Sequence, residues 1–229
     1  MHPLKNVIWQ ALTTRQAQFA ESCDRARRFV REVTSLCAFD EPGDEGYDSL
    51  SRLTGSGGTA AVFLDKPYES RAGWEYVAGA PLLQMHCNNG AASHNSASSP
   101  QVLELGAKDS PDMLELTALT KPGPFGPRTH ELGHYVGIRD GGKLVAMAGE
   151  RLKVPGYTEV SAVCTHPDHL GRGYAGLLMS EVMRRIRERG EIPFLHVRAD
   201  NTRAIAIYER LGFRTAWDGH FAVLRRVHS

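Results

Sequence analysis

A connection between a strand and a helix, built around two glycines, is the feature that most restricts how this chain can fold. The segment 165–176, THPDHLGRGYAG, follows an apolar strand pattern and opens a helical pattern over 171–189. Gly171 and Gly173 allow the backbone to approach a ligand closely, and the N–H groups of a helix's first turn have no partners within the helix. The segment therefore predicts an anion site suited to a pyrophosphate, where Arg172 could add a charged contact.

The same segment could also be a plain tight connection without a ligand. It differs from two other glycine-rich phosphate loops. No Gly-Lys-Ser/Thr follows it, as it would in a nucleotide P-loop, and the Gly-x-Gly-x-x-Gly spacing of Gly171, Gly173 and Gly176 indicates a Rossmann fold only within a strand-helix-strand unit of parallel strands. The elements before it are of the antiparallel hairpin type, so a dinucleotide-binding fold is not expected.

After residue 100, strands and helices follow one another in an order that predicts a mixed α/β fold of the α+β kind. The expected elements are a strand at 101–105, a helix at 110–119, strands at 133–139, 143–152 and 157–165, a helix at 171–189, a strand at 192–197, a helix at 201–211, and a closing hairpin of 213–217 and 221–225 around Asp218 and Gly219. Before residue 88, weaker patterns predict helices at 6–12 and 44–53 and strands at 60–65 and 82–87.

Residues 88–100, NNGAASHNSASSP, contain no charged and no large apolar side chain, so they predict a flexible linker. The linker divides the chain into a module of residues 1–87 and one of residues 101–229. The first has 9 Lys and Arg against 11 Asp and Glu, and the second has 18 against 15. The slightly basic module is the one that holds the expected anion site.

Charge and hydropathy exclude several classes of protein. A formal net charge of +1 favours neither a polybasic nucleic-acid binder nor an acidic disordered chain. No apolar run approaches the roughly 20 residues of a membrane helix, and no secretory signal is evident, so we expect a cytoplasmic protein without a membrane or nucleic-acid partner. The 4 cysteines form no Cys-x-x-Cys pair, so neither a disulfide framework nor a metal site is expected.

A second motif follows in the helix expected at 201–211. Asn201, Ala204 and Tyr208 share one helical face, which would place an amide, a small residue and a phenol along one groove. A phenol there could donate a proton to a leaving group. Taken alone, the motif is better explained by an N-cap and a buried tyrosine.

Together, the two motifs resemble the GNAT superfamily of N-acyltransferases, and the resemblance covers residues 101–226. The superfamily pattern Gln/Arg-x-x-Gly-x-Gly/Ala is found as Leu170-Gly171-Arg172-Gly173-Tyr174-Ala175, with Leu in place of the first residue. The pattern Asn-x-x-Ala-x-x-x-Tyr-Glu-x-x-Gly-Phe is matched in full by residues 201–213. The resemblance implies a GNAT-like fold in which acyl-coenzyme A lies across a V-shaped opening between two parallel strands.

What the resemblance implies about function is an acetyl-coenzyme A dependent N-acetyltransferase without a metal. A deprotonated primary amine of a small molecule or peptide would attack the thioester directly, and Tyr208 would protonate the departing thiolate. The oligomeric state is left open. The residues expected to bind the cofactor are Val163, Cys164, Thr165, Leu170, Gly171, Arg172, Gly173, Tyr174, Ala175, Gly176 and Asn201.

A base for the amine is sought on the strand at 157–165. Alternation would put Glu159 on the same face as Ser161, Val163 and Thr165, so Glu159 is the leading candidate, although an outward surface carboxylate explains it equally well. Glu150 is the second candidate for the base and His134 is the third. By the same alternation Cys164 would lie on the opposite face, as a packed thiol rather than a nucleophile.

The acceptor pocket is expected to involve the segment 121–131, KPGPFGPRTHE, which could equally be a Pro-rich connector. Its possible contacts are Phe125, Arg128, His130 and Glu131. We expect the module 1–87 to be a smaller, degenerate GNAT-like unit without a cofactor, which walls the acceptor site or mediates association. The run Arg25, Arg27, Arg28 and Arg31 could bind phosphate, but interleaved acidic residues favour a solvated face.

Two classes of function remain open at this point. The first is the N-acetyltransferase. The second is a non-catalytic acyl-coenzyme A sensor or partner-binding module that keeps the fold but has lost turnover. Both share the cofactor site, so only the release of free thiol with amines separates them.

Overall fold

The computed structural model describes residues 2–88 and 100–227. Most expected elements are present within a few residues of their expected bounds. The helices are α1 (Val7–Thr13), α2 (Asp44–Thr54), α3 (Ser110–Thr120), α4 (Tyr174–Glu188) and α5 (Thr202–Arg210), with short 3-10 turns at Ala17–Phe19, Ala107–Asp109, Thr129–Leu132 and Pro167–His169. The strands are β1 (Ala20–Cys23), β2 (Ala26–Phe29), β3 (Cys37–Phe39), β4 (Thr59–Leu64), β5 (Trp74–His86), β6 (Leu103–Leu105), β7 (Tyr135–Asp140), β8 (Lys143–Val154), β9 (Tyr157–Thr165), β10 (Ile192–Arg198) and β11 (Arg214–Arg226).

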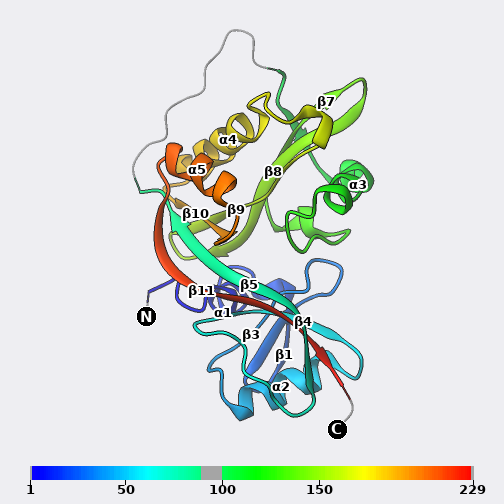
Figure 1. Cartoon of the computed structure of the whole chain (residues 1–229), viewed down its shortest axis with the longest axis vertical. Coiled ribbons are helices and arrows are strands. Elements are labelled where there is room, and N and C mark those ends of the chain that lie inside the picture. Colours follow the sequence, from blue (N-terminus) through cyan, green and yellow to red (C-terminus); the bar gives the residue numbers. More distant parts are fainter. Residues whose placement is uncertain (1, 89–99, 228–229) are drawn as a thin grey trace.

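Eight strands form one sheet in the order β4-β11-β5-β10-β9-β8-β7-β6. The strand pairs are antiparallel except β9 and β10, which are parallel. Figure 1 shows that β5 and β11 are long and run from the upper half of the elongated molecule into the lower half. A separate sheet, β1-β2-β3, lies in the lower half beside α2. The sequence patterns did not predict these three strands, which have only three or four residues each.

The expected closing hairpin around Asp218 and Gly219 was wrong, because residues 214–226 form the single strand β11. Both residues of the expected turn lie within a ladder, opposite Leu83 and Leu82 of β5. This turn-forming pair stays extended because β5 offers both residues an antiparallel partner, and β4 pairs with the other edge of β11 from His220 onward. The place beside β10 is therefore filled by β5, a strand from the N-terminal part of the chain.

This arrangement also changes the expected role of residues 1–87. Their strands β4 and β5 belong to the same sheet as the strands of 101–229, and the degenerate GNAT-like character of this module stays a prediction. Residues 89–99 of the expected linker lie outside the described residues. The division at 88–100 stays a prediction about the course of the chain, but it does not separate two sheets.

Helices cover the upper part of the sheet on both faces (Figure 1). One face packs against α4 and α5 through Leu178, Met179, Val182 and Phe213, which are fully buried. On the other face a smaller cluster joins α3 to the sheet around Tyr135. The amphipathic period of four in α4 thus makes the contact that the sequence predicted for it.

The two parallel strands separate soon after they meet. Pairing between β9 and β10 runs only from Tyr157↔Ile192 to Glu159↔Phe194. Beyond this point β10 continues along β5 and β9 continues along β8. A wedge-shaped opening therefore lies between the ends of two parallel strands, and the α4 N-terminus follows directly on β9.

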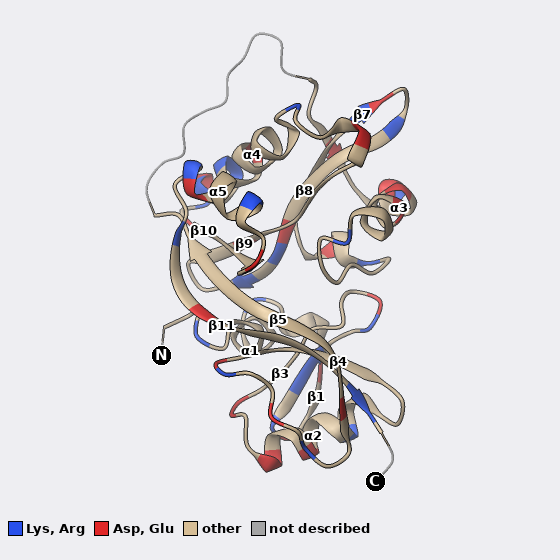
Figure 2. Cartoon of the chain, viewed as in Figure 1, with Lys and Arg blue, Asp and Glu red and all other residues tan. Residues whose placement is uncertain are grey.

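A buried polar chain crosses four neighbouring strands where the separation begins. Arg151 of β8 donates from Nε and Nη2 to the two carboxylate oxygens of Glu159 on β9, at 2.8 and 2.7 Å. His196 of β10 lies 2.6 Å from Glu159 Oε1 through Nδ1, and its Nε2 lies 3.0 Å from the amide nitrogen of Gln84 on β5. We call these four residues the polar clamp. Figure 2 shows charged residues on the lower part of β8, within a sheet that is mostly uncharged.

The clamp is almost inaccessible to water and largely self-satisfied. The exposed side-chain fractions are 9% for Arg151, 0% for Glu159 and 3% for His196. Burial by itself would raise the pKa of Glu159, but the charge and hydrogen bonds of Arg151 outweigh it and, with His196, lower this pKa to about 2. Glu159 is therefore a permanent anion between two fixed partners.

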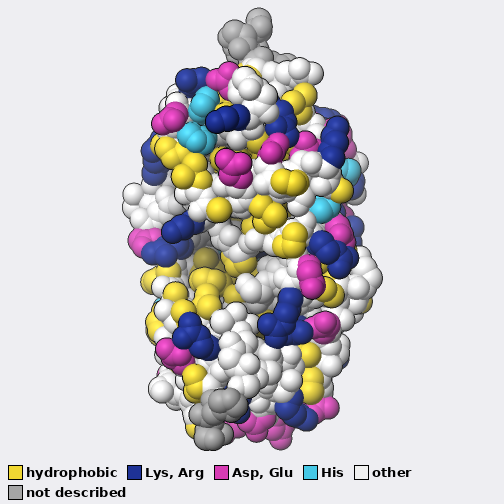
Figure 3. Space-filling model, turned by 90° about the vertical axis from the view of Figure 1, so that its right-hand side faces the viewer, with side chains coloured by type: hydrophobic (Ala, Val, Ile, Leu, Met, Phe, Trp, Pro, Cys, Tyr) yellow, Lys and Arg dark blue, Asp and Glu magenta, His cyan; other side chains and the backbone are white. Residues whose placement is uncertain are grey.

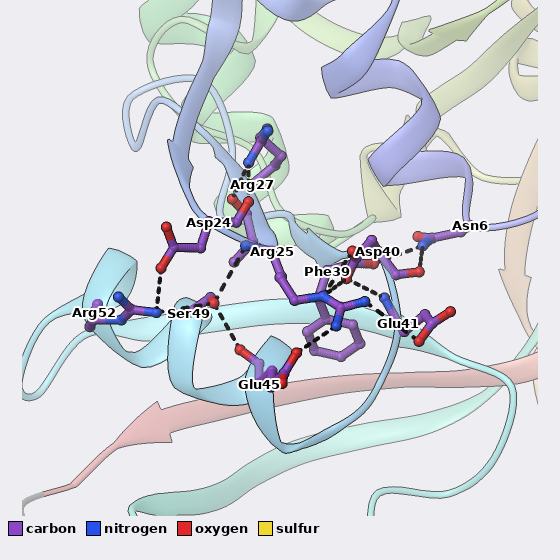
Figure 4. A network of polar contacts seen from close by, with 11 residues as sticks. Asn6, Asp24, Arg25, Arg27, Phe39, Asp40, Glu41, Glu45, Ser49 and Arg52 are labelled. Carbon is purple, nitrogen blue, oxygen red and sulfur yellow. Dashed lines mark hydrogen bonds and ion pairs between the residues drawn. The ribbon is translucent and has the colours of Figure 1, made fainter.

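The arginines of the cationic run in the first module are engaged by other groups of the protein, as Figure 4 shows for Arg25 and Arg27. Arg25 binds Asp40 at 2.9 and 3.0 Å and Glu45 at 2.6 Å. Arg31 donates to the carbonyl of Thr54. Of the other two, Arg28 pairs with Glu21, and Arg27 lies over the ring of Trp9. The structure supports the solvated face over the phosphate patch.

Among the described residues, no helix is both long enough and apolar enough to cross a membrane.

The clamp generates a prediction about stability and pH. Since the pKa of Glu159 falls from an ordinary 4.5 to about 2 on folding, its ionised form stabilises the fold fully above about pH 4.5, and this is lost as the pH falls towards 2. Over that pH window the free energy of unfolding of the wild type should fall by about 3 kcal/mol, a loss that Glu159→Gln should not show. At pH 7 the variant should be destabilised by about 3 kcal/mol, because Arg151 stays buried without its partner.

Urea unfolding at pH 7, 4 and 3 measures both effects. Glu115→Gln, at an exposed position on α3, is the matched control and should follow the wild type. If the free energy of unfolding depends on pH in the same way in the wild type and in Glu159→Gln, the ionised Glu159 does not contribute this stability.

Candidate active site

The loop before α4 has the conformation that the two glycines predicted. Gly171 and Gly173 have φ values of 81° and 77°, and Gly173 is the N-cap of α4. No atom lies within 4 Å of where a Cβ would stand at either glycine, so the space above the loop is open. The N–H groups of the first turn, from Tyr174 to Gly176, have no partners within the helix. They lie at the helix N-terminus, whose partial positive charge favours anions. Leu170, at the start of the loop, is 50% exposed.

Arg172 is positioned beside this loop but has an acidic neighbour. Its Nη1 lies 3.7 Å from Asp140 Oδ2, and about half of its side chain is exposed. Asp140 also contacts His169, at 3.0 Å. The contact between Arg172 and Asp140 is long and open to solvent, so an incoming phosphate can compete with Asp140 for Arg172.

The end of β9 provides backbone groups beside the opening. Val163, Cys164 and Thr165 all lie beyond the last pairing of β9 with β10. Their edge of the strand faces the wedge, while the other edge pairs with β8. The Cys164 thiol packs against the α3 side of the sheet, and burial raises its pKa to about 11, as expected for a packed thiol rather than a nucleophile.

A bulge in β9 overturns the expected alternation. Ala162 has a φ of 53°, and the register with β8 jumps between Met147↔Cys164 and Gly149↔Ser161. Val160 and Val163 pack against the α4 face, whereas Ala162 and Cys164 pack against the α3 face. One extra residue thus reverses the side-chain direction, and Glu159 does not share a face with Val163 and Thr165.

Glu159, the leading candidate for the base, is unsuited to that role. Both of its oxygens are taken by the polar clamp, its side chain has no exposed surface, and its pKa of about 2 leaves almost no basicity at neutral pH. The bulge and the clamp could not be read from alternation, because both depend on the neighbouring strands.

The other two candidates are not brought to the opening either. Glu150 is fully buried and bound to Lys153 at 2.8 Å and Arg189 at 2.7 Å. Burial opposes ionisation there, but the two cations outweigh it and lower the pKa of Glu150. His134 is exposed at the start of β7, with its backbone N–H near Glu150.

The second motif, residues 201–213, forms the helix N-cap and the packed tyrosine that its simpler explanation predicted. Asn201 is the N-cap of α5, and its side chain accepts from the Ala204 N–H at 3.1 Å. Tyr208 packs at the edge of the α4 cluster, with its ring centroid 6.2 Å from that of Phe213. Burial raises the pKa of Tyr208 to about 12, so its phenol stays protonated at neutral pH and keeps a proton to donate.

The segment 121–131 is partly at the site. Its first half, including Phe125, lines a narrow pocket with Ser161 and Ala162 at the β9 bulge. Arg128 and Glu131 instead form a surface ion pair with each other. Figure 3 shows that this side of the molecule, to which α3 belongs, is hollowed at mid-height, and that hydrophobic side chains gather in the hollow.

Sequence reasoning missed the residues that cross the sheet. Arg151 and His196 are polar residues inside apolar strand patterns, and this anomaly is the one signal that could have indicated them. In residues 2–88 and 100–227, no group of three His, Cys, Asp or Glu side chains is placed to hold a metal ion.

Comparisons with known proteins agree with this geometry. A family model described as FR47-like protein matches residues 135–222. The N-alpha-acetyltransferase RimI of Mycobacterium tuberculosis is 40% identical over 84 residues, which are 35% of this chain and 52% of that protein. A mycothiol acetyltransferase of Corynebacterium aurimucosum is 41% identical over 63 residues, or 27% of this chain and 21% of that protein. The matches thus span about half and about a fifth of these two curated relatives.

The solved structures extend the likeness to the whole chain. A GNAT-family protein from Novosphingobium aromaticivorans is 32% identical, with a TM-score of 0.91 and coverage of 100% of both chains. A GCN5-related N-acetyltransferase from Kribbella flavida has a TM-score of 0.62 at 17% identity, covers 98% of this chain and 94% of its own, and supports the fold alone. The wedge between β9 and β10, the glycine loop before α4 and the full-length match lead to one conclusion: the chain belongs to the GNAT family of acetyltransferases.

Proposed function

We propose that the protein is an acetyl-coenzyme A dependent N-acetyltransferase that acts on a primary amine. The observation that carries the proposal is the separation of β9 and β10 directly before the open glycine loop of α4. A strand edge with unpaired backbone groups suits an extended pantetheine arm, and the helix N-terminus suits a pyrophosphate.

The proposed cofactor contacts follow the course of the chain. The pantetheine arm would lie along the backbone of Val163, Cys164 and Thr165. The pyrophosphate would accept hydrogen bonds from the backbone N–H groups between Leu170 and Gly176, with Arg172 exchanging Asp140 for phosphate. Asn201 would act by starting α5 rather than by touching the cofactor, since its side chain is used as a helix cap.

The proposed reaction is direct transfer. The nitrogen of a neutral amine attacks the thioester carbonyl carbon, and a backbone N–H of β9 stabilises the oxyanion. The C–N bond forms, the C–S bond breaks with its electron pair on sulfur, and Tyr208 protonates the thiolate. The proton released by the nitrogen passes to water, and the Tyr208 phenolate regains a proton from water before the next turnover. Glu159 is a positioning residue in this scheme, because it ties β8, β9 and β10 together at the wedge.

The acceptor is proposed to be an amine of a peptide or a small molecule. The curated relatives carry names for one activity of each kind, an N-alpha-acetyltransferase and a mycothiol acetyltransferase. One observation favours the non-catalytic alternative, an acyl-coenzyme A sensor: both carboxylates considered as bases are locked in ion pairs. Release of free thiol from acetyl-coenzyme A with a panel of amines separates the two.

The cofactor site is tested by calorimetric titration of acetyl-coenzyme A into the protein and its Gly173→Glu variant. The wild type should bind, and the variant should bind at least tenfold more weakly, because a carboxylate would stand where the pyrophosphate lies. Gly190→Glu is the matched control: Gly190 has a similar φ of 74° and open space, but lies after the other end of α4. Equal loss in both variants would trace the effect to backbone strain.

The acid role is tested by Tyr208→Phe. We expect kcat to fall at least tenfold while the affinity for acetyl-coenzyme A changes little, because the phenyl ring keeps the packing and loses only the proton. Tyr47→Phe, at a buried tyrosine of the lower half, should leave both quantities unchanged. Unchanged turnover in Tyr208→Phe would remove this residue from the mechanism.

A further inference from the structure

A narrow pocket lies on the α3 side of the sheet, next to the bulge of β9. It is a narrow space between the loop 122–125 and the sheet. The walls on the sheet side are Tyr135, Arg151, Ser161 and Ala162. Ser161 and Ala162 belong to the stretch of β9 that has no β10 partner, so the pocket opens beside the place proposed for the thioester.

Two hydrogen-bond donors on the pocket wall have no acceptor. The hydroxyl of Tyr135 is buried and, within the described part of the chain, has no partner, although the residue is only 1% exposed. Arg151 donates from Nε and Nη2 to Glu159, and no hydrogen bond of its Nη1 is found among the described residues. Nη1 points towards the loop, 3.9 Å from where a Cβ of Gly123 would stand.

The positions of both donors are set by the surrounding structure. Tyr135 lies flat over Gly149, where a Cβ would come within 2.2 Å of its ring, and Phe125 packs edge-on against it at 5.9 Å. Arg151 is held by the clamp. The pocket is too narrow to hold a water molecule, so water inside it does not satisfy the buried Tyr135 hydroxyl. Buried donors without partners are costly, and a ligand oxygen would relieve that cost.

Charge decides which kind of oxygen fits. The cation of Arg151 is already balanced by Glu159, and burial raises the pKa of Tyr135, so the phenol is neutral. A carboxylate would add an uncompensated buried anion, whereas a neutral carbonyl oxygen accepts from both donors at once. The pocket also borders β9 directly, so that oxygen must lie within a few bonds of the reacting nitrogen.

We propose that this pocket receives the carbonyl oxygen of the acceptor, and that the acceptor is an α-aminoacyl amide such as the N-terminus of a peptide. Tyr135 and Arg151 donate to the carbonyl next to the α-carbon, while the amine faces the thioester beside β9. The loop 122–125 moves outward to admit the group, and Gly123, with a φ of 139°, lies at its centre. This inference rests on the proposed N-acetyltransferase activity and specifies its substrate class.

The test compares three acceptors of similar size: glycinamide, glycine and propylamine. Because these amines differ in basicity, the ratio of kcat/KM for glycinamide to that for propylamine is compared between proteins. Tyr135→Phe should lower this ratio on the order of tenfold, the effect of one lost hydrogen bond in a buried site. Tyr47→Phe should leave it unchanged, and glycine should be a poorer substrate than glycinamide in the wild type.

A binding measurement keeps the inference separate from turnover. N-acetylglycinamide, the product, should bind to the protein loaded with coenzyme A, and Tyr135→Phe should weaken this binding about tenfold. If propylamine is acetylated but the ratio and the binding do not change in Tyr135→Phe, the pocket assignment is overturned while the activity stands. A preference for glycine would also overturn it. If no amine is acetylated although acetyl-coenzyme A binds, the proposed activity fails, and product binding alone decides the pocket.

Discussion

The buried ion pair between Arg151 and Glu159 is the interaction on which the rest of the site depends. A charged pair inside a sheet is costly to desolvate, and it is tolerated here because its hydrogen bonds are nearly all satisfied by the neighbouring strands. It lies where β9 and β10 stop pairing, so it stabilises the two strands at the point where they must separate. The wedge, the β9 bulge and the unpaired donors of the pocket wall all lie around this pair.

The cofactor side of the site needs little from side chains. Open space over Gly171 and Gly173, the first turn of α4 and the free edge of β9 are all properties of the backbone. The proposed acceptor side is the opposite case, since Tyr135, Arg151 and the loop 122–125 would act there through specific side-chain donors and through the shape of the pocket that they line. Side chains on the proposed acceptor side can therefore change without disturbing the backbone groups proposed to hold the cofactor.

Sequence patterns predicted α4 to within three residues, and also the glycine loop and the Asn201 cap, because each is a local property of a few consecutive residues. They failed where the outcome depends on a partner strand. The turn-forming Asp218 and Gly219 became part of β11 because β5 runs beside them, and Ala162 reversed the side-chain direction of β9 through a bulge against β8. For the same reason Glu159 was expected at the opening as a base and lies instead in an ion pair.

By itself, the sequence determined the family-like motifs, the helices after residue 100 and the glycine loop before α4, since local spacing and glycine content specify them. Only the tertiary structure decided that residues 74–86 complete the sheet of the second module, that four strands share one polar chain, and that Tyr135 and Arg151 line one pocket. These features join residues far apart in the chain, and their energies come from burial and pairing that no local pattern contains.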